Sequence, residues 1–285
     1  MFHQTTTIRT ALQAATETLR QAGSDTAYLD ALVLMGHVLG LSKEQLFART
    51  EDPLSPADHS RFEALIQLRA QGEPVAYLRG VKEFYGRNFL VDPRVLIPRP
   101  DTETLVDTAL ALIDANPDIR TVFDCCTGSG CVAITLALER PMIAVAAGDV
   151  SRDALTVCRQ NVARLAPDRV QLYQSNMMNA VPGRFDLIVA NPPYVRTAEV
   201  DAMRAARWPE PTLALDGGTD GLDVPRHLMK SALEHLAPNR YLVIEGAYDQ
   251  RAGMFEAFHQ TGFIAEDVVS DLAGRDRVYV GKTRA

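Results

Sequence analysis

The sequence lacks any apolar run near the ~20 residues that a membrane-spanning helix needs, and its first ten residues, MFHQTTTIRT, lack the apolar core of a signal peptide. It has only four cysteines, at positions 125, 126, 131 and 158, and their spacing matches no disulfide framework. From these absences we expect a cytoplasmic protein with reduced thiols and no membrane partner.

The sequence also has fewer basic residues than acidic residues. There are 29 Lys and Arg residues against 36 Asp and Glu residues, which gives a formal net charge of -7. This balance argues against a large basic surface, so we expect a protein or small-molecule substrate and no direct contact with nucleic acid. The six histidines are scattered, and His227 and His235 share an expected helix without the i, i+4 spacing of a metal site. We therefore predict no metal.

The residues that are present are typical of a two-domain globular protein. Hydrophobic residues make up 47% and charged residues 23% of the 285 positions, which is enough apolar material for a sizeable core. Apolar residues recur at steps of three and four from Ile8 to Leu19 and beyond, which predicts a small helical bundle over residues 1–75. The β-rich runs VAYL and EFYGRNFLVD follow Pro74, and we interpret residues 76–98 as a β-hairpin linker that turns at Gly86.

Residues 99–285 alternate apolar strands with helices. Strand-like runs such as TVFDCC, IAVAAGDV and FDLIVA are separated by stretches with helical periodicity. This alternation predicts an α/β domain with a mostly parallel, doubly wound, Rossmann-like sheet beside the small N-terminal helical domain. The connection DLAGRD is too short for a crossover helix, so we expect the last strand to run antiparallel to its neighbour.

A glycine-rich turn, TGSG, follows the first strand of this α/β domain, at the place where doubly wound sheets bind ligands. Gly128 and Gly130 let the backbone approach a ligand and expose N–H groups at a helix N-terminus, and Asp124 can accept hydrogen bonds from the ligand or order the turn. Asp149 ends the next strand about 20 residues later, where a carboxylate can accept from both ribose hydroxyls.

This turn favours a nucleoside over a triphosphate. It lacks the lysine of a GxxxxGK[ST] motif, so no obvious group would neutralise a triphosphate. S-adenosylmethionine fits better. On the turn alone, NAD remains an alternative ligand, and so does a tight turn that binds nothing.

The tetrapeptide Asn191, Pro192, Pro193 and Tyr194 directly follows the strand FDLIVA. In a doubly wound sheet it reaches the same carboxyl edge as the glycine turn. The Asn191 side-chain oxygen and the Pro192 carbonyl can accept both N–H bonds of an amide or aromatic amine, which aims the nitrogen lone pair at a sulfonium methyl group. Proline fixes the carbonyl direction, and Tyr194 offers an aromatic face for the target.

A rigid turn after a strand is the alternative reading of this tetrapeptide. The order of strand end, glycine turn and ribose acid argues against it. Residue spacing by itself predicts an amide or amine N-methyltransferase, with Asn191, Pro192 and Tyr194 as catalytic residues and all four residues of the tetrapeptide in contact with substrate.

The strings GEPVAYLRG, VLIPRPDTETLVD, TGSG, NPPYV, EPTLALDGGTDGL and DLAGRDRVYVG resemble the release factor glutamine methyltransferases of the HemK or PrmC type over nearly the whole chain. The resemblance implies a helical N-terminal domain joined to a class I methyltransferase domain. It also implies transfer of a methyl group from S-adenosyl-L-methionine to N5 of the glutamine in the GGQ loop of peptide-chain release factors.

The family's cofactor residues carry over by position. The cofactor loop falls on Cys126, Thr127, Gly128, Ser129 and Gly130, the ribose acid on Asp149 and the adenine-flanking residue near Met177; Asp124 and Asn191 complete the expected cofactor contacts. Two positions depart from the family pattern. Cys126 stands where Gly is common, and Asn176 stands where an Asp often contacts adenine, so we expect altered affinity more than lost activity.

Three other functions compete with this interpretation. The nearest is a sister family that methylates a glutamine in a large-subunit ribosomal protein, although that family usually has a serine after PR and lacks the DLAGRDRVYVG ending. An adenine-N6 nucleic-acid methyltransferase uses a similar clamp but has to flip its base, and the acidic balance disfavours it. The last is a non-catalytic binding module. We expect a monomer whose helical bundle docks the protein substrate, and a loop around Trp208 that covers substrate or packs.

Overall fold

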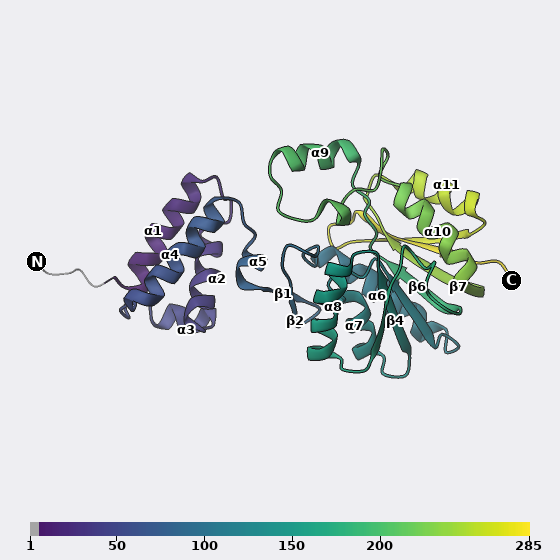
Figure 1. The fold of residues 1–285 in the computed structure, drawn as a ribbon, viewed down its shortest axis with the longest axis horizontal. Coiled ribbons are helices and arrows are strands. Elements are labelled where there is room, and N and C mark those ends of the chain that lie inside the picture. The colour runs from purple at the N-terminus through teal and green to yellow at the C-terminus, as the bar shows by residue number, and fades with distance from the viewer. Residues whose placement is uncertain (1–5) are drawn as a thin grey trace, which may run out of the picture. The chain divides into compact units, whose positions relative to one another are not determined.

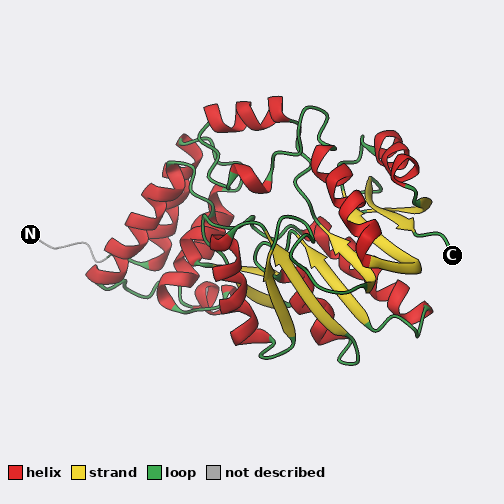
Figure 2. Cartoon of the chain, turned by 45° about the vertical axis from the view of Figure 1, so that its right-hand side comes forward, coloured by secondary structure: helices red, strands yellow, loops and turns green. Residues whose placement is uncertain are grey.

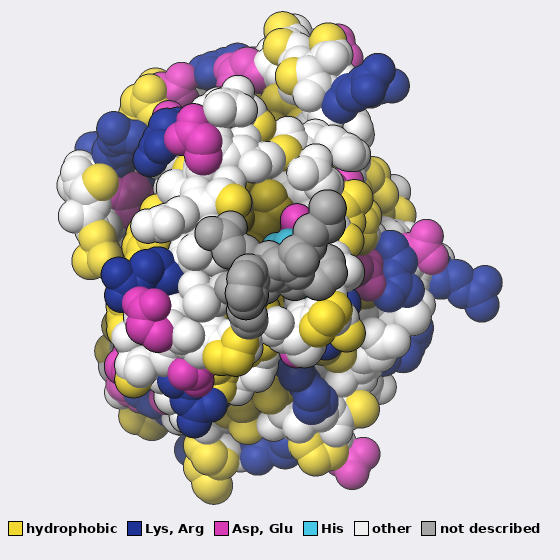
Figure 3. All heavy atoms as spheres, turned by 90° about the vertical axis from the view of Figure 1, so that its left-hand side faces the viewer, with side chains coloured by type: hydrophobic (Ala, Val, Ile, Leu, Met, Phe, Trp, Pro, Cys, Tyr) yellow, Lys and Arg dark blue, Asp and Glu magenta, His cyan; other side chains and the backbone are white. Residues whose placement is uncertain are grey.

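The computed structural model describes residues 6–285 and divides the chain into two compact units, Met1–Val81 and Lys82–Ala285. Residues 1–5, which belong to the predicted bundle and to the stretch in which no signal peptide is expected, lie outside the described residues. Within residues 6–285, no helix is long and apolar enough to cross a bilayer. On the face drawn in Figure 3, Lys and Arg side chains are interspersed with Asp and Glu side chains.

The first unit is a set of helices around its own apolar core (Figure 1). The helices are α1 (Ile8–Gln21), α2 (Ala27–Leu39), α3 (Lys43–Ala48), α4 (Pro56–Ala70) and α5 (Val75–Arg79). Three of them begin where a hydroxyl accepts from a backbone N–H of the first turn, because Thr7, Ser42 and Ser55 act as N-caps. Leu19 and Phe62 are fully buried in the core that these helices share.

One buried carboxylate joins two helices of this unit. Asp30 on α2 accepts from Arg69 Nε on α4 at 2.8 Å. Two local hydroxyls, Ser24 Oγ and Thr26 Oγ1, each donate to it at 3.1 Å. Because an unpaired buried charge is strongly destabilising, these partners make the contact specific for this helix pairing.

The structure corrects the end of the predicted bundle. The β prediction for VAYL is wrong, since Val75–Arg79 forms the short helix α5, which Pro74 precedes and Gly80 ends in a left-handed conformation. Helical structure therefore extends beyond residue 75 into the predicted linker 76–98.

The predicted hairpin turn is confirmed. Strands β1 (Val81–Phe84) and β2 (Arg87–Leu90) pair in a two-stranded sheet. Tyr85 and Gly86 between them have φ of 51° and 72°, and a two-residue turn with both φ positive matches the twist of paired strands.

The second unit is built on a seven-stranded sheet in the order β5-β4-β3-β6-β7-β9-β8. Its strands are β3 (Thr121–Cys125), β4 (Ala144–Asp149), β5 (Val170–Gln174), β6 (Phe185–Ala190), β7 (Leu236–Glu245), β8 (Ile264–Ser270) and β9 (Asp276–Lys282). The pairs from β5 to β7 are parallel, and β9 is antiparallel to both β7 and β8. This confirms the doubly wound, Rossmann-like prediction and the antiparallel final strand.

Helices cover both faces of this sheet (Figure 2). They are α6 (Glu103–Ala115), α7 (Cys131–Glu139), α8 (Arg152–Leu165), α10 (Asp223–His235) and α11 (Arg251–Thr261). The unit also has the helix α9 (Thr197–Ala205), which contributes to neither core, and the 3-10 turns η1 (Pro100–Thr102) and η2 (Thr212–Ala214). Side chains alternate between the two cores, so Leu187 packs with α6 and α7 while Ile188 packs with α10 and α11. The apolar runs of the central strands follow from burial on both faces.

Candidate active site

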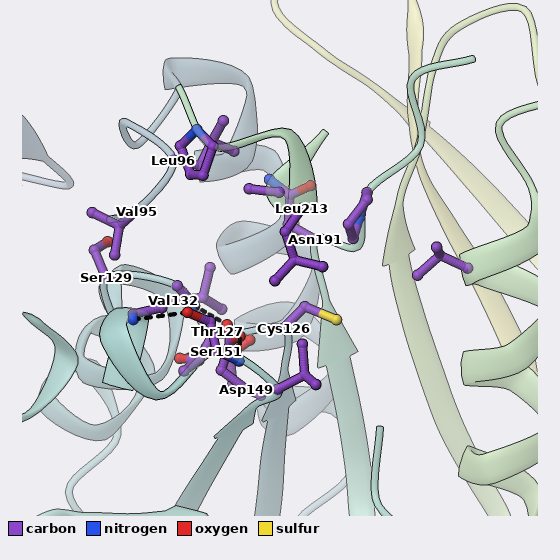
Figure 4. A pocket seen from close by; sticks show the side chains of 18 of the residues that line it. Val95, Leu96, Cys126, Thr127, Ser129, Val132, Asp149, Ser151, Asn191 and Leu213 are labelled. Atoms are coloured by element: carbon purple, nitrogen blue, oxygen red, sulfur yellow. Dashed lines mark hydrogen bonds between the residues drawn. The ribbon is translucent and has the colours of Figure 1, made fainter. Parts of the chain in front are cut away.

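A cavity of about 680 Å³ lies in the second unit at the carboxyl ends of β3, β4, β5 and β6. The parallel register aligns these ends, because Cys125 pairs with both Gly148 and Ala190. The predicted site residues that line the cavity are Asp124, Cys126, Thr127, Gly128, Ser129, Asp149, Asn176, Met177, Asn191 and Pro193. Figure 4 shows Val95 and Leu96 across the cavity from Asn191 and Cys126, with Asp149 and Ser151 below.

Asp124 orders the glycine turn. Its Oδ2 accepts from Thr127 Oγ1 at 2.6 Å and from the backbone N–H of Ala133 in α7 at 3.1 Å. Burial raises the pKa of Asp124 to about 7, and these two hydrogen bonds oppose the rise. The second role that the sequence offers for Asp124, ordering the turn, is therefore the one for which the structure has contacts.

Asp149 holds the other side of the turn. Its Oδ2 accepts from the Gly128 backbone N–H at 2.9 Å, and its Oδ1 accepts from the Ser151 N–H at 2.8 Å. Burial raises its pKa, and the backbone hydrogen bonds oppose that shift. Each carboxylate oxygen keeps a further lone pair for a hydroxyl in the cavity.

The two glycines of the turn have different roles. Gly128 has φ of 54° and nothing lies within 4 Å of the position of an added Cβ, so the backbone there faces open cavity. A Cβ on Gly130 would lie 2.6 Å from Cys158 Sγ, and Gly130 is not among the cavity-lining residues. Gly130 therefore permits close packing of the turn against α8 and does not face the cavity.

Two non-glycine residues of the cavity wall have left-handed backbone conformations. Cys126 has φ of 61° and Met177 has φ of 49°. The conformation costs an L-residue about 1–2 kcal/mol, and it explains why glycine suits position 126. Asn176 and Met177 follow β5 after one intervening residue, and both line the cavity.

Asn191 is anchored by Thr102, a residue that no local motif marks as part of the site. Its Nδ2 donates to Thr102 Oγ1 at 3.1 Å, and both residues line the cavity. Thr102 lies in IPRPDTE, 89 positions earlier in the chain. Because the amide nitrogen is engaged, the side-chain oxygen is the atom of Asn191 left for a ligand.

The rest of the tetrapeptide divides between cavity and core. Pro193 lines the cavity, whereas Pro192 is buried. Tyr194 is not among the lining residues, and its hydroxyl donates to Glu245 Oε1 at 3.0 Å. Burial raises the pKa of Tyr194, with the charge of Glu245 as the next cause. The aromatic face expected for the target therefore lies outside the cavity wall in this structure.

Glu210 is a second residue without a sequence signal of its own. Its buried carboxylate accepts from the Ile97 backbone N–H at 2.9 Å, from Arg99 and from Trp208 Nε1 at 3.0 Å. These contacts fasten the loop after α9 to the IPRP segment, and both segments contribute to the cavity wall. The strings IPRPDTE and EPTLALDGG could have indicated this pairing, because they are among the most specific in the chain.

Two protein families match the sequence, the PrmC N-terminal domain over residues 10–80 and the methyltransferase small domain over residues 102–208. A release factor glutamine methyltransferase of Moorella thermoacetica is 40% identical over 281 residues, covering 98% of this chain and 99% of the relative. Another from Cereibacter sphaeroides is 41% identical and covers 94% and 95%.

Solved structures agree on the fold. A ribosomal protein L11 methylase from Lactobacillus delbrueckii subsp. bulgaricus matches with a TM-score of 0.51 at 21% identity, over 68% of this chain and 84% of that chain. At such low identity the similarity concerns only the architecture. The sequence relatives, which match both units at about twice that identity, decide the family: this chain belongs to the release factor glutamine methyltransferases.

Proposed function

We propose that this chain transfers a methyl group from S-adenosyl-L-methionine to N5 of the glutamine in the GGQ motif of peptide-chain release factors. The observation that carries the proposal is the Asn191 side chain at the cavity wall, with its nitrogen bound to Thr102 and its oxygen left to accept. The identity of the protein substrate is inferred from the names of the relatives.

The residues at the strand ends suit the cofactor. Asp149 provides acceptors for ribose hydroxyls, Gly128 admits a ligand beside the backbone, and Met177 provides an apolar surface for the base. Bound there, S-adenosyl-L-methionine supplies an electrophilic sulfonium methyl group. The remaining work of this chain is to orient the acceptor nitrogen and to exclude water.

Orientation of the acceptor is the task assigned to the tetrapeptide. A carboxamide nitrogen is a weak nucleophile because its lone pair is delocalised. Acceptance of one N–H by Asn191 Oδ1 and of the other by the Pro192 carbonyl would fix the nitrogen and favour a localised lone pair. We assign substrate binding to Asn191, Pro192 and Pro193, and to Tyr194 an indirect role through the position of the tetrapeptide.

The partner of this chain and its assembly state are part of the same proposal. We propose a monomer whose first unit docks the release factor, and no direct nucleic-acid contact; the formal net charge of -7 supports the last point. Action on a translation factor supports a cytoplasmic location.

A direct competition assay tests the substrate. The chain is incubated with labelled S-adenosyl-L-methionine, purified release factors and purified large-subunit ribosomal proteins, and modified peptides are identified by mass spectrometry. We expect one methyl group on the GGQ glutamine. Label on a ribosomal-protein glutamine alone would favour the sister activity, and label on DNA adenine alone would favour a nucleic-acid enzyme.

A further inference from the structure

Asn191 can serve as an acceptor only if its carboxamide is held one way round. The oxygen and nitrogen of a carboxamide have nearly the same shape, and a half-turn about the last side-chain bond would present N–H donors to a substrate that itself donates. A neighbouring side chain of the protein has to distinguish the two orientations. The residue in contact with the Asn191 nitrogen is Thr102, at 3.1 Å.

Thr102 is available to orient Asn191 because its side chain does not cap a helix, which is the usual role of a threonine at a helix start. It is the N-cap of α6, but its side chain makes no capping hydrogen bond to that helix. It is 2% exposed, although polar side chains at helix starts are usually solvated. The hydroxyl is therefore available for side-chain partners, and replacing it removes no cap.

A hydroxyl alone does not select an orientation, because it can donate or accept. Its single hydrogen has to be directed elsewhere for the oxygen to accept from Asn191. Glu245 is the last residue of β7 and is 1% exposed. It lies beside Thr102, and the Thr102 hydroxyl lowers the pKa of this carboxyl group. Its Oε1 accepts from Tyr194, while its Oε2 is buried and has no hydrogen-bond partner among the described residues.

The charges around Glu245 keep it an acceptor. Burial raises its pKa to about 6, and Thr102, Tyr194 and the positive charge of Arg277 oppose that rise, whereas Asp101 adds to it. Arg277 in turn pairs with Asp271 at 3.1 Å and with Asp101 at 3.2 Å. The positive charge of Arg277 favours the ionised form of the carboxyl group, and an ionised carboxylate can only accept.

We propose that Thr102 is a positioning residue that, with Glu245, fixes the orientation of the Asn191 carboxamide. In this proposal the Thr102 oxygen accepts from Asn191 Nδ2, as observed, and its hydrogen turns toward Glu245 Oε2, the buried acceptor that lacks a partner, so Asn191 Oδ1 faces the cavity. Tyr194 donates to the other oxygen of the same carboxylate, which ties the two ends of the tetrapeptide to one anchor. This inference rests on the proposed function only for the identity of the acceptor nitrogen.

Substitution of Thr102 separates orientation from folding. Thr102→Val keeps the β-branched shape and removes the hydroxyl, and Thr102→Ser keeps the hydroxyl. Thr108→Val is the matched control, because Thr108 lies on α6 and, among residues 6–285, its hydroxyl bonds to the Thr104 carbonyl of the same helix, at 2.7 Å. Steady-state methyl transfer to a purified release factor is measured with the cofactor and the acceptor varied in turn.

We expect Thr102→Val to lower kcat by roughly 10- to 100-fold with the KM for S-adenosyl-L-methionine within about threefold of the unchanged chain. Thr102→Ser should restore kcat to within about threefold, and Thr108→Val should leave it unchanged. Wild-type kcat in Thr102→Val, or a serine variant as impaired as the valine variant, would overturn the proposal.

Two further measurements keep the test decisive. If Thr102→Val does not fold, Glu245→Gln replaces it, because a glutamine can also donate and no longer forces the hydroxyl direction; an unchanged kcat there would overturn the proposal. The side-chain NH2 signal of Asn191 in a 15N NMR spectrum requires no methyl acceptor. It should shift in Thr102→Val and return in Thr102→Ser, even if the release factor proves to be the wrong substrate, and an unmoved signal counts against the positioning role.

Discussion

The two sides of the cavity are built in different ways. On the cofactor side, contacts come from the backbone of one turn and from a carboxylate that the next strand delivers, as in the bond from the Gly128 N–H to Asp149. On the acceptor side, side chains from distant parts of the chain meet, since Asn191 depends on Thr102 and the loop after α9 depends on Glu210. The first side is a local motif on a sheet edge, and the second is an assembly of long-range contacts.

This difference sets what each substitution should do. Changes on the acceptor side should lower turnover and spare cofactor binding, because the groups there act on the nucleophile. Changes on the cofactor side should weaken cofactor binding where they remove a hydrogen-bonding group, and should leave cofactor affinity unchanged where they do not.

The largest expected effect is that of Asn191→Ala. Loss of the accepting oxygen should lower kcat by about 100- to 1,000-fold, by analogy with removal of one preorganised hydrogen-bonding group, while the cofactor Kd stays within about threefold. Turnover is measured with release factor, and binding by calorimetry. Because Asn191 was also expected to contact the cofactor, a comparable loss of cofactor affinity would break the comparison and assign it to the other side.

The next effect is on cofactor affinity. Asp149→Ala removes the acceptor for the Gly128 and Ser151 N–H groups and the acceptor proposed for ribose, so the cofactor Kd should rise by about 10- to 100-fold, since each charge-assisted hydrogen bond contributes about 1.5–3 kcal/mol. At saturating cofactor, kcat should fall much less. Asp153→Ala, an exposed position on α8, is the control and should leave the Kd unchanged. A reduced kcat with a normal Kd would contradict this role.

The same difference explains how much the sequence could predict. The fold, the glycine turn, Asp149 and the tetrapeptide were predictable, because strand periodicity and motif order place them at one sheet edge. The partners Thr102, Glu210 and Glu245 were not, because no local pattern says which distant side chain meets which. Tyr194 shows the limit most clearly: its position was predictable, but the direction of its ring depends on Glu245, 51 residues away.

A smaller effect is expected where a contact shapes the wall without touching the reacting atoms. Glu210→Gln keeps an acceptor for the Ile97 N–H but removes the charge that Arg99 faces, so we expect the KM for release factor to rise about three- to tenfold with kcat within about twofold. The free energy of unfolding should fall by about 1–2 kcal/mol. Glu199→Gln, in an exposed ion pair with Arg196, is the control and should change neither quantity. An unchanged KM would mean that the loop only packs.

The smallest expected effect is that of Cys126→Gly, on the side of the cavity that the backbone builds. Glycine relieves the left-handed backbone strain at φ of 61°, which stabilises the folded chain. Its greater freedom in the unfolded chain offsets part of this stabilisation, so the free energy of unfolding should be unchanged or up to about 1 kcal/mol higher. Asp168→Gly, at an exposed position with φ of 60°, is the matched control for backbone strain and should behave alike in thermal unfolding. The cofactor Kd should stay within about threefold, because the turn would contribute N–H groups there and not a side chain. A loss of affinity above about tenfold would show instead that the thiol of Cys126 contacts the cofactor, and that this side of the cavity also depends on side-chain identity.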